Sequence, residues 1–247
     1  MKTNMIKSGI KHLIFLLLPF VGLSQNATYV GIEVGPKFEI YQSVDNGDRL
    51  STKPFFFNPI YGFVLGQELS NVFAVETGFF VNNYGESYRV EGDDFGTVAY
   101  SAIIAFQIPL RLKARMSLVR NTLSLTSTVG YTIAINNDYG SSGSGSSSID
   151  FNNNSVSSNH TSNYSLQKTY GLIEAGLGLD YRFKNSLRLS LAANYLAGLS
   201  KVIEVDVMYR VNSEPEQQGT VFSNGDYFSL VFGVKYPISN FWRKAGE

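Results

Sequence analysis

Apolar and polar residues alternate with a period of two between Tyr100 and Arg115. The even positions of this segment are mostly apolar, whereas the odd positions include Gln107, Arg111, Lys113 and Arg115. Successive side chains of a β-strand point to opposite faces of the sheet. The segment therefore predicts a strand with one hydrocarbon face and one charged face.

The same alternation recurs along the chain and gives eight predicted strands. They cover residues 28–41, 55–68, 72–84, 100–115, 122–136, 169–183, 187–200 and 227–238. The connections between them are alternately long and short, beginning with a long one. An even number of antiparallel strands with short periplasmic turns and long outer loops is typical of bacterial outer-membrane barrels. We therefore expect an all-β fold: an eight-stranded antiparallel up-and-down transmembrane β-barrel with both termini on the periplasmic side.

The polar rows of these strands help to distinguish a membrane barrel from a water-soluble one. They consist mainly of Gly, Ala, Ser and Thr, and charged residues make up only 16% of the chain, against about a quarter in soluble domains. A solvated sheet face is expected to carry more charge. The pattern therefore favours lipid against the apolar rows. The alternative is a soluble exported barrel of the lipocalin type, with the apolar rows turned inward around a ligand.

Charged residues of the strands fall on the polar rows, which would line the interior of such a barrel. The predicted lumen set comprises Glu33, Lys37, Glu39, Glu76, Arg111, Lys113, Glu174, Asp180, Arg182 and Arg188. The interior of an eight-stranded barrel is just wide enough for side chains to fill it. Buried charges must pair, so we predict a structural network of ion pairs rather than a conduction path.

Aromatic residues of the apolar rows gather near the ends of the predicted strands. Those near short connections are Phe73, Tyr181, Phe183 and Tyr236, and those near long connections are Tyr100, Tyr131 and Tyr195. Such positions suit the aromatic girdles of a membrane barrel, although tyrosine is also a common strand residue.

Pro109 lies in the middle of a predicted strand. Proline has no amide hydrogen, so it removes one donor from the hydrogen-bond ladder. We therefore predict a bulge or a locally open hydrogen bond at this position.

The first 24 residues resemble a secretory signal peptide. Lys2, Lys7 and Lys11 form a basic region, and an apolar stretch at 13–21 precedes small residues at 22–24. A helix that spans a membrane needs about 20 apolar residues, and this apolar stretch is shorter than that. We expect cleavage after Ser24, an outer-membrane barrel domain over 25–247, and assembly by the barrel-assembly machinery into outer-membrane lipid as a monomer.

The segment from about 137 to 167 is almost wholly Ser, Asn and Gly. It has too few apolar residues to repay the entropy of ordering. We expect a mobile outer loop.

Composition excludes several kinds of chemistry. The formal net charge is zero, so no overall field attracts nucleic acid. The chain has no cysteine, which excludes disulfides and thiolate metal sites. We expect no cofactor.

Candidate catalytic and metal-binding residues are few. His160 lies in the Ser/Asn-rich segment with no fixed acid or hydroxyl neighbour that the sequence identifies, and a general base must be held in place. The acidic turns at 45–48 and 93–94 could lie near Ca²⁺, but neither supplies the ligand set of a calcium loop. We therefore predict no catalytic residue and no metal site.

Three segments resemble the PorT-type outer-membrane β-barrel family of Gram-negative bacteria. They are V-F-A-V-E-T-G-F-F-V-N-N-Y-G at 72–85, F-Q-I-P-L-R-L-K at 106–113 and Y-L-A-G-L at 195–199. The resemblance implies an eight-stranded barrel and little about activity, because most members have none assigned and a few serve protein secretion. The chain departs from the family pattern after Tyr236, where residues 237–247 continue beyond the aromatic residue that commonly ends such barrels.

These features predict a non-enzymatic outer-membrane barrel that acts through its extracellular loops, in binding, adhesion or membrane structure, on an unidentified extracellular ligand or protein. Three alternatives stay open. They are an outer-membrane hydrolase using His160, a component of a protein secretion or transport apparatus, and the soluble lipocalin-like binder.

Overall fold

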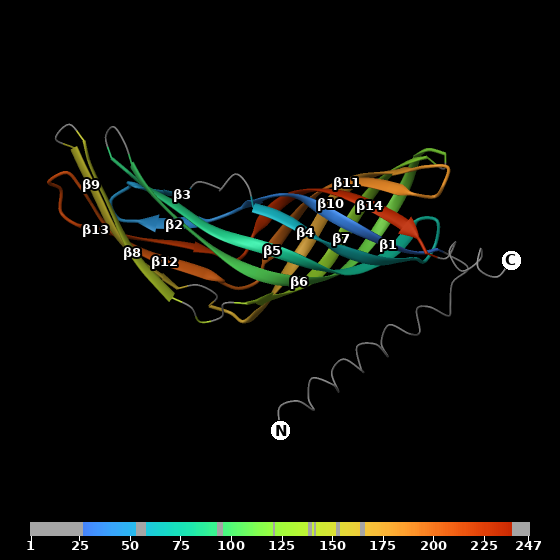
Figure 1. Cartoon of the computed structure of the whole chain (residues 1–247), viewed down its shortest axis with the longest axis horizontal. Coiled ribbons are helices and arrows are strands. Elements are labelled where there is room, and N and C mark those ends of the chain that lie inside the picture. The colour runs from blue at the N-terminus through green and yellow to red at the C-terminus, as the bar shows by residue number, and fades with distance from the viewer. Residues whose placement is uncertain are drawn as a thin grey trace, which may run out of the picture.

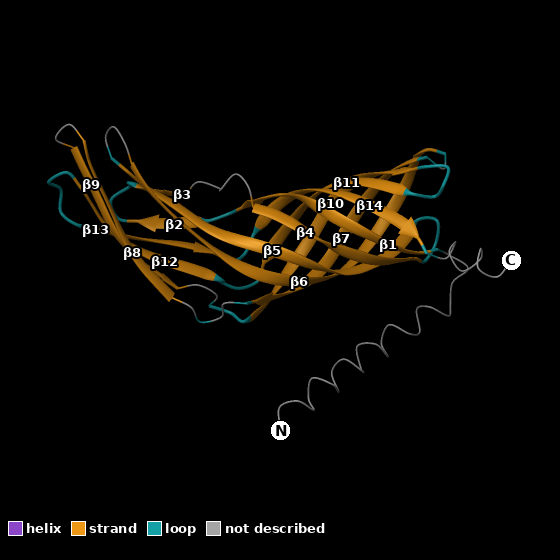
Figure 2. Ribbon diagram, viewed as in Figure 1, coloured by secondary structure: helices purple, strands orange, loops and turns teal. Residues whose placement is uncertain are grey.

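A computed structural model describes residues 27–52, 58–92, 96–120, 122–137, 140, 142–151, 154–163 and 166–238. The predicted signal peptide and the Asp93–Asp94 turn lie outside these residues. The described chain consists of strands and connections (Figure 2). No helix in it is long and apolar enough to cross a membrane.

Eight strands close into a barrel, as the alternation predicts. In chain order they are β1 (Thr28–Glu39), β4 (Asn58–Glu68), β5 (Phe73–Glu91), β6 (Gly96–Val119), β7 (Leu123–Asn136), β10 (Thr169–Arg182), β11 (Arg188–Gly198) and β14 (Tyr227–Pro237). Each pairs antiparallel with the next, and β1 pairs with β14 to close the ring. The up-and-down topology is therefore confirmed.

Both described ends of the chain lie at the end of the barrel that carries the short turns (Figure 1). There the amide of Ile238 donates to the carbonyl of Thr28 at 2.8 Å. The turn between β4 and β5 is held by Ser70, whose hydroxyl accepts from the amides of Val72 (3.1 Å) and Phe73 (3.0 Å). Short turns mark the periplasmic end of such barrels, so the long connections lie outside the cell.

The ladder at Pro109 is interrupted on one side, as predicted. Toward β7 the pairing passes through Pro109 opposite Thr132 without a shift. Toward β5 the pairs stop at Leu110 and resume at Gln107 in the same register. The hydroxyl of Thr77 donates instead to the carbonyl of Pro109 at 2.8 Å. The strand keeps its register with a local opening, while the irregularity in β6 lies at 117–119.

Three of the four long connections contain further strands beyond the outer end of the barrel. These are β2 (Gln42–Asp45), β3 (Leu50–Thr52), β8 (Ser142–Phe151), β9 (Asn154–Asn163), β12 (Ile203–Val211) and β13 (Gln217–Ser223). Five of them form one antiparallel sheet in the order β2-β13-β12-β9-β8, called the outer sheet below. The sixth, β3, pairs with the projecting end of β5. Figure 1 places the outer sheet at the end of the molecule opposite the first residues of β1 and the last residues of β14.

Strands extend into connections that the sequence predicts as irregular. The predicted connection between residues 84 and 100 contains the outer part of the β5–β6 hairpin. The Ser/Asn/Gly-rich segment contains the β8–β9 hairpin, because β9 pairs along its length with β12, a strand with buried Val205, Val207 and Tyr209. The neighbouring strand thus supplies the apolar surface that the segment itself lacks. Its mobility stays a prediction.

Candidate functional site

The outer surface of the barrel is an apolar belt. Its exposed side chains include Ile32, Phe63, Leu110, Val129, Ile173, Leu177, Leu191, Leu230 and Phe232. The opposite rows, which face the interior, carry Glu33, Glu76, Arg111 and other buried polar groups. A lipocalin-like arrangement requires the apolar rows inside, so that alternative is wrong.

Aromatic pairs stand at both ends of the belt. Tyr181 and Phe183 contact each other edge to face at 4.9 Å between ring centroids near the short turns. At the other end the ring centroids of Tyr195 and Phe228 lie 4.8 Å apart. All four side chains are exposed, as girdle residues must be.

The middle of the barrel interior holds a chain of six charged groups that alternate in sign, which we call the lumen ion chain. Its members are, in order, Glu174, Arg111, Glu33, Lys235, Glu76 and Lys113. The five successive nitrogen–oxygen distances are 2.9, 3.0, 3.1, 2.6 and 2.7 Å. Three acids face three bases, so the cluster is neutral. It joins β10, β6, β1, β14 and β5 across the lumen.

Tyr29 packs beside this chain and closes more of the lumen. Its hydroxyl donates to Glu76 at 2.7 Å. A Cβ at Gly66 would lie 2.2 Å from the Tyr29 ring, so glycine at that position leaves the space that the ring occupies. Small residues on the polar rows thus make room for large lumen side chains.

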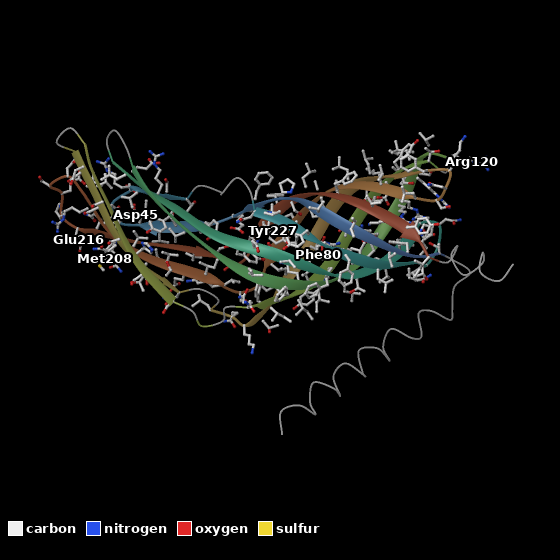
Figure 3. All side chains as sticks on the ribbon, viewed as in Figure 1. Asp45, Phe80, Arg120, Met208, Glu216 and Tyr227 are labelled. Atoms are coloured by element: carbon white, nitrogen blue, oxygen red, sulfur yellow. The ribbon has the colours of Figure 1, made fainter. Side chains whose placement is uncertain are left out.

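Above the ion chain, toward the outer end, a second cluster fills the lumen. Lys37 pairs with Glu39 at 2.5 Å, and its ammonium lies 3.9 Å from the centroid of the Tyr84 ring. Gln107 donates to the Tyr84 hydroxyl at 3.0 Å and accepts from the Tyr227 hydroxyl at 2.8 Å. All five side chains are buried. Figure 3 labels Tyr227 in this region, between the two ends of the molecule.

Below the ion chain, the periplasmic mouth contains a third group of charges. Glu68 accepts from Arg115 and from Arg188, both at 2.5 Å. Asp180 lies 3.6 Å from Arg115. These contacts tie β4, β6, β10 and β11 together at the base of the barrel.

Nine of the ten predicted lumen charges are buried inside the barrel, and Arg182 is not. Arg182 is the last residue of β10, so its side chain lies at the mouth, where it is exposed. The prediction missed Lys235, Glu68 and Arg115, which complete the ion pairs. All three alternate with the apolar residues of their strands, so the pattern that identified the other lumen charges identifies these three as well.

The outward face of the outer sheet is mainly polar, with charged residues that include Glu204, Asp206 and Arg210 of β12, and we call it the polar face. Alternate residues of β12 point inward and are buried, namely Val205, Val207, Tyr209 and Val211. The intervening positions form cross-strand rows. One row is Ser144, Thr161, Asp206, Thr220 and Val44, and another is Ser146, Asn159, Met208 and Gln218. Hydroxyls and amides therefore dominate this face.

The acidic turn after β2 is closed by its own aspartate. Both carboxylate oxygens of Asp45 accept from the Tyr209 hydroxyl (2.7 and 2.9 Å), and they also accept from the amides of Gly47, Arg49 and Leu50. Burial opposes ionisation, but these hydrogen bonds outweigh it and lower the pKa of Asp45. The carboxylate thus serves the turn, and among the described residues no group of three His, Asp or Glu side chains is placed to hold a metal ion.

His160 lies on the inner side of the outer sheet. Its ring contacts the ring of Tyr88 from β5 edge to face, with centroids 5.6 Å apart, and a Cβ at Gly145 would lie 2.6 Å from it. Burial lowers the pKa of His160. Its Nδ1 atom is buried and has no hydrogen-bond partner among the described residues, whereas the imidazole of a catalytic triad is oriented by an acid at this nitrogen. The contacts of this side chain are those of a packing residue.

A closed eight-stranded barrel with an apolar belt, aromatic ends and a charge-filled interior defines the class: this is an outer-membrane β-barrel protein of Gram-negative type. Closure gives every barrel strand a neighbour on both sides, which is what spanning a membrane with strands requires.

Comparison with known proteins gives structural neighbours only. No protein-family model matches the chain, and no curated protein matches it. Solved structures similar to it include the outer membrane enzyme PagL (12% identity, 85% of this chain and 99% of that chain covered, TM-score 0.36). Ail, the attachment invasion locus protein of Yersinia pestis, has 12% identity and a TM-score of 0.35, and the match covers 85% of this chain and 99% of that chain. The outer membrane protein AlkL in lipid bilayers has 15% identity and a TM-score of 0.35, and the match covers 87% of this chain and 92% of that chain.

Proposed function

We propose that this protein is a non-conducting, non-enzymatic surface-binding protein, in which the barrel is the anchor and the outer sheet is the binding element. The observation that carries the proposal is that the long outer connections form one continuous sheet with a buried apolar side. A connection that serves only to close a barrel does not need such a sheet. The filled lumen supports an anchoring role for the barrel itself.

The chemistry of the polar face supports a ligand class. Ser, Thr, Asn and Gln side chains offer both donors and acceptors without a net charge, and their regular cross-strand spacing presents them as a broad array. A neutral polymer rich in hydroxyl groups matches this surface. We therefore propose that the protein binds a neutral polysaccharide outside the cell.

A binding experiment tests this function. Purified full-length protein in detergent is applied to an array of neutral and acidic glycans. We expect binding to neutral glycans that falls at least tenfold in Asn159→Arg, because this outward residue of β9 stands in the middle of the polar face.

The matched control is Asn185→Arg, the same substitution at an exposed residue of the β10–β11 turn at the opposite end of the barrel. It should bind as the wild type does. Absence of binding to any neutral glycan, or an equal loss in both variants, would contradict the proposal.

We also propose that the chain belongs to the PorT-type family. The support is the three segments that resemble the family. Segment 72–85 lies on β5 and the residue before it, segment 106–113 lies on β6, and segment 195–199 covers the end of β11. A role in a secretion apparatus would follow the family's few assigned members. Co-purification of the intact protein with secretion components from its native membrane would favour that role over glycan binding.

A further inference from the structure

A polar cavity opens at the periplasmic mouth of the barrel. Its volume is about 370 Å³, and its charged lining residues are Glu68, Arg115, Arg120, Asp180, Arg182 and Arg188. The remaining walls are hydroxyl and amide side chains. Figure 3 labels Arg120 at this end of the molecule, far from the outer sheet. The cavity is therefore separate from the surface to which we assign glycan binding.

The charges of this cavity are not balanced. Four arginines against two carboxylates leave a formal charge of +2. Both carboxylates are engaged by Arg115 and Arg188, since Glu68 bridges the two and Asp180 lies beside Arg115. Among the described residues, no carboxylate forms an ion pair with Arg120 or Arg182, and both side chains are exposed at the mouth.

Arg115 supplies a second, independent indication that an acceptor belongs here. Its side chain is only 10% exposed. Its Nε and Nη2 atoms are buried and have no hydrogen-bond partner, because the oxygen of Asp180 at 3.6 Å from Nε is too distant. Buried donors are normally satisfied, so these two guanidinium donors of a cavity-lining residue indicate that the cavity suits a ligand with acceptor oxygens.

The arrangement of donors fits phosphate. Guanidinium groups bind phosphate oxygens through paired N–H donors, and the hydroxyls of Ser117, Thr122 and Ser124 line the same cavity. A phosphate monoester carries up to two negative charges, which match the unbalanced +2. The volume lies within the range of small-molecule sites. We propose that the periplasmic mouth of the barrel binds a phosphate monoester.

Titration calorimetry on the full-length protein tests this site. In detergent micelles at low salt, we expect glycerol 3-phosphate to bind at least tenfold more tightly than acetate, which carries one charge. The double variant Arg120→Gln/Arg182→Gln should bind it at least tenfold more weakly. Both replaced side chains are exposed, so the variant is expected to fold, and a heat-dependent shift on SDS gels checks this. Arg210→Gln, an exposed arginine on β12, is the control and should bind as the wild type.

The same phosphate chemistry occurs in solution and on a lipid headgroup, and a second arm separates the two. Lipid nanodiscs containing phosphatidic acid are compared with nanodiscs of phosphatidylcholine alone. Binding of glycerol 3-phosphate supports a soluble ligand, and a response only to phosphatidic acid supports a headgroup. No response to either, or equal affinity in the wild type and the double variant, would overturn the proposal. Glycan binding is unaffected by either result.

Discussion

Replacing Arg111 with methionine is expected to lower the free energy of unfolding of the barrel by about 3–5 kcal/mol, because removal of one partner leaves buried charges uncompensated. Arg111 joins Glu33 (3.0 Å) to Glu174 (2.9 Å) in the lumen, where the side chains are nearly inaccessible. The measurement is the urea midpoint of the full-length protein in lipid vesicles, followed by the heat-dependent mobility of the folded barrel on SDS gels.

Arg210→Met serves as the matched control, since Arg210 is exposed on β12 outside the membrane. Its unfolding free energy should change by no more than about 0.5 kcal/mol. The double variant Arg111→Met/Glu174→Leu should recover part of the loss, because it also removes one of the two acids. Equal midpoints for Arg111→Met and Arg210→Met would show that the lumen ion chain does not stabilise the barrel.

Leu177→Arg is expected to destabilise the folded barrel by about 2–4 kcal/mol, the cost of a cation near the middle of the lipid. Leu177 lies in the middle of β10, and its side chain is 63% exposed. That exposure is to hydrocarbon if the apolar belt faces lipid. The effect is measured as the shift in urea midpoint in vesicles.

Val44→Arg is the control, because Val44 is also 63% exposed but lies on β2 of the outer sheet. In water an exposed substitution changes stability by only about 0.5 kcal/mol. A large loss of stability for Leu177→Arg with little change for Val44→Arg would show that the belt around Leu177 lies in the membrane and that β2 lies outside it. Similar effects in the two variants would mean that the belt does not contact lipid.

The barrel could be predicted because the alternation that identifies each strand lies within that strand's own residues. Every barrel strand alternates in parity, and the predicted limits of 169–183 and 227–238 differ from β10 and β14 by a single residue at one end. Lipid on one face and a narrow lumen on the other force this alternation. The opening at Pro109 followed in the same way from the missing amide hydrogen of one residue.

The outer sheet could not be predicted, because its pairings are long-range. Val44 of β2 lies opposite Thr220 of β13, and Val207 of β12 lies opposite His160 of β9. The β8–β9 hairpin is too polar to indicate a buried strand by itself. The pairing of Arg115 and Arg188 through Glu68 likewise depends on three different strands meeting at the mouth. Parity identifies the face of such a residue but not its partner.

Conductance measured on the purified full-length protein in planar lipid bilayers tests the central claim most directly. The lumen ion chain, Tyr29 and the cluster around Lys37 fill the interior with buried side chains, so we predict no steady channel at any applied voltage. Insertion is verified in the same membranes by protease protection of the barrel. A stable open conductance from inserted wild-type protein would contradict the account of a filled barrel that anchors a surface-binding sheet.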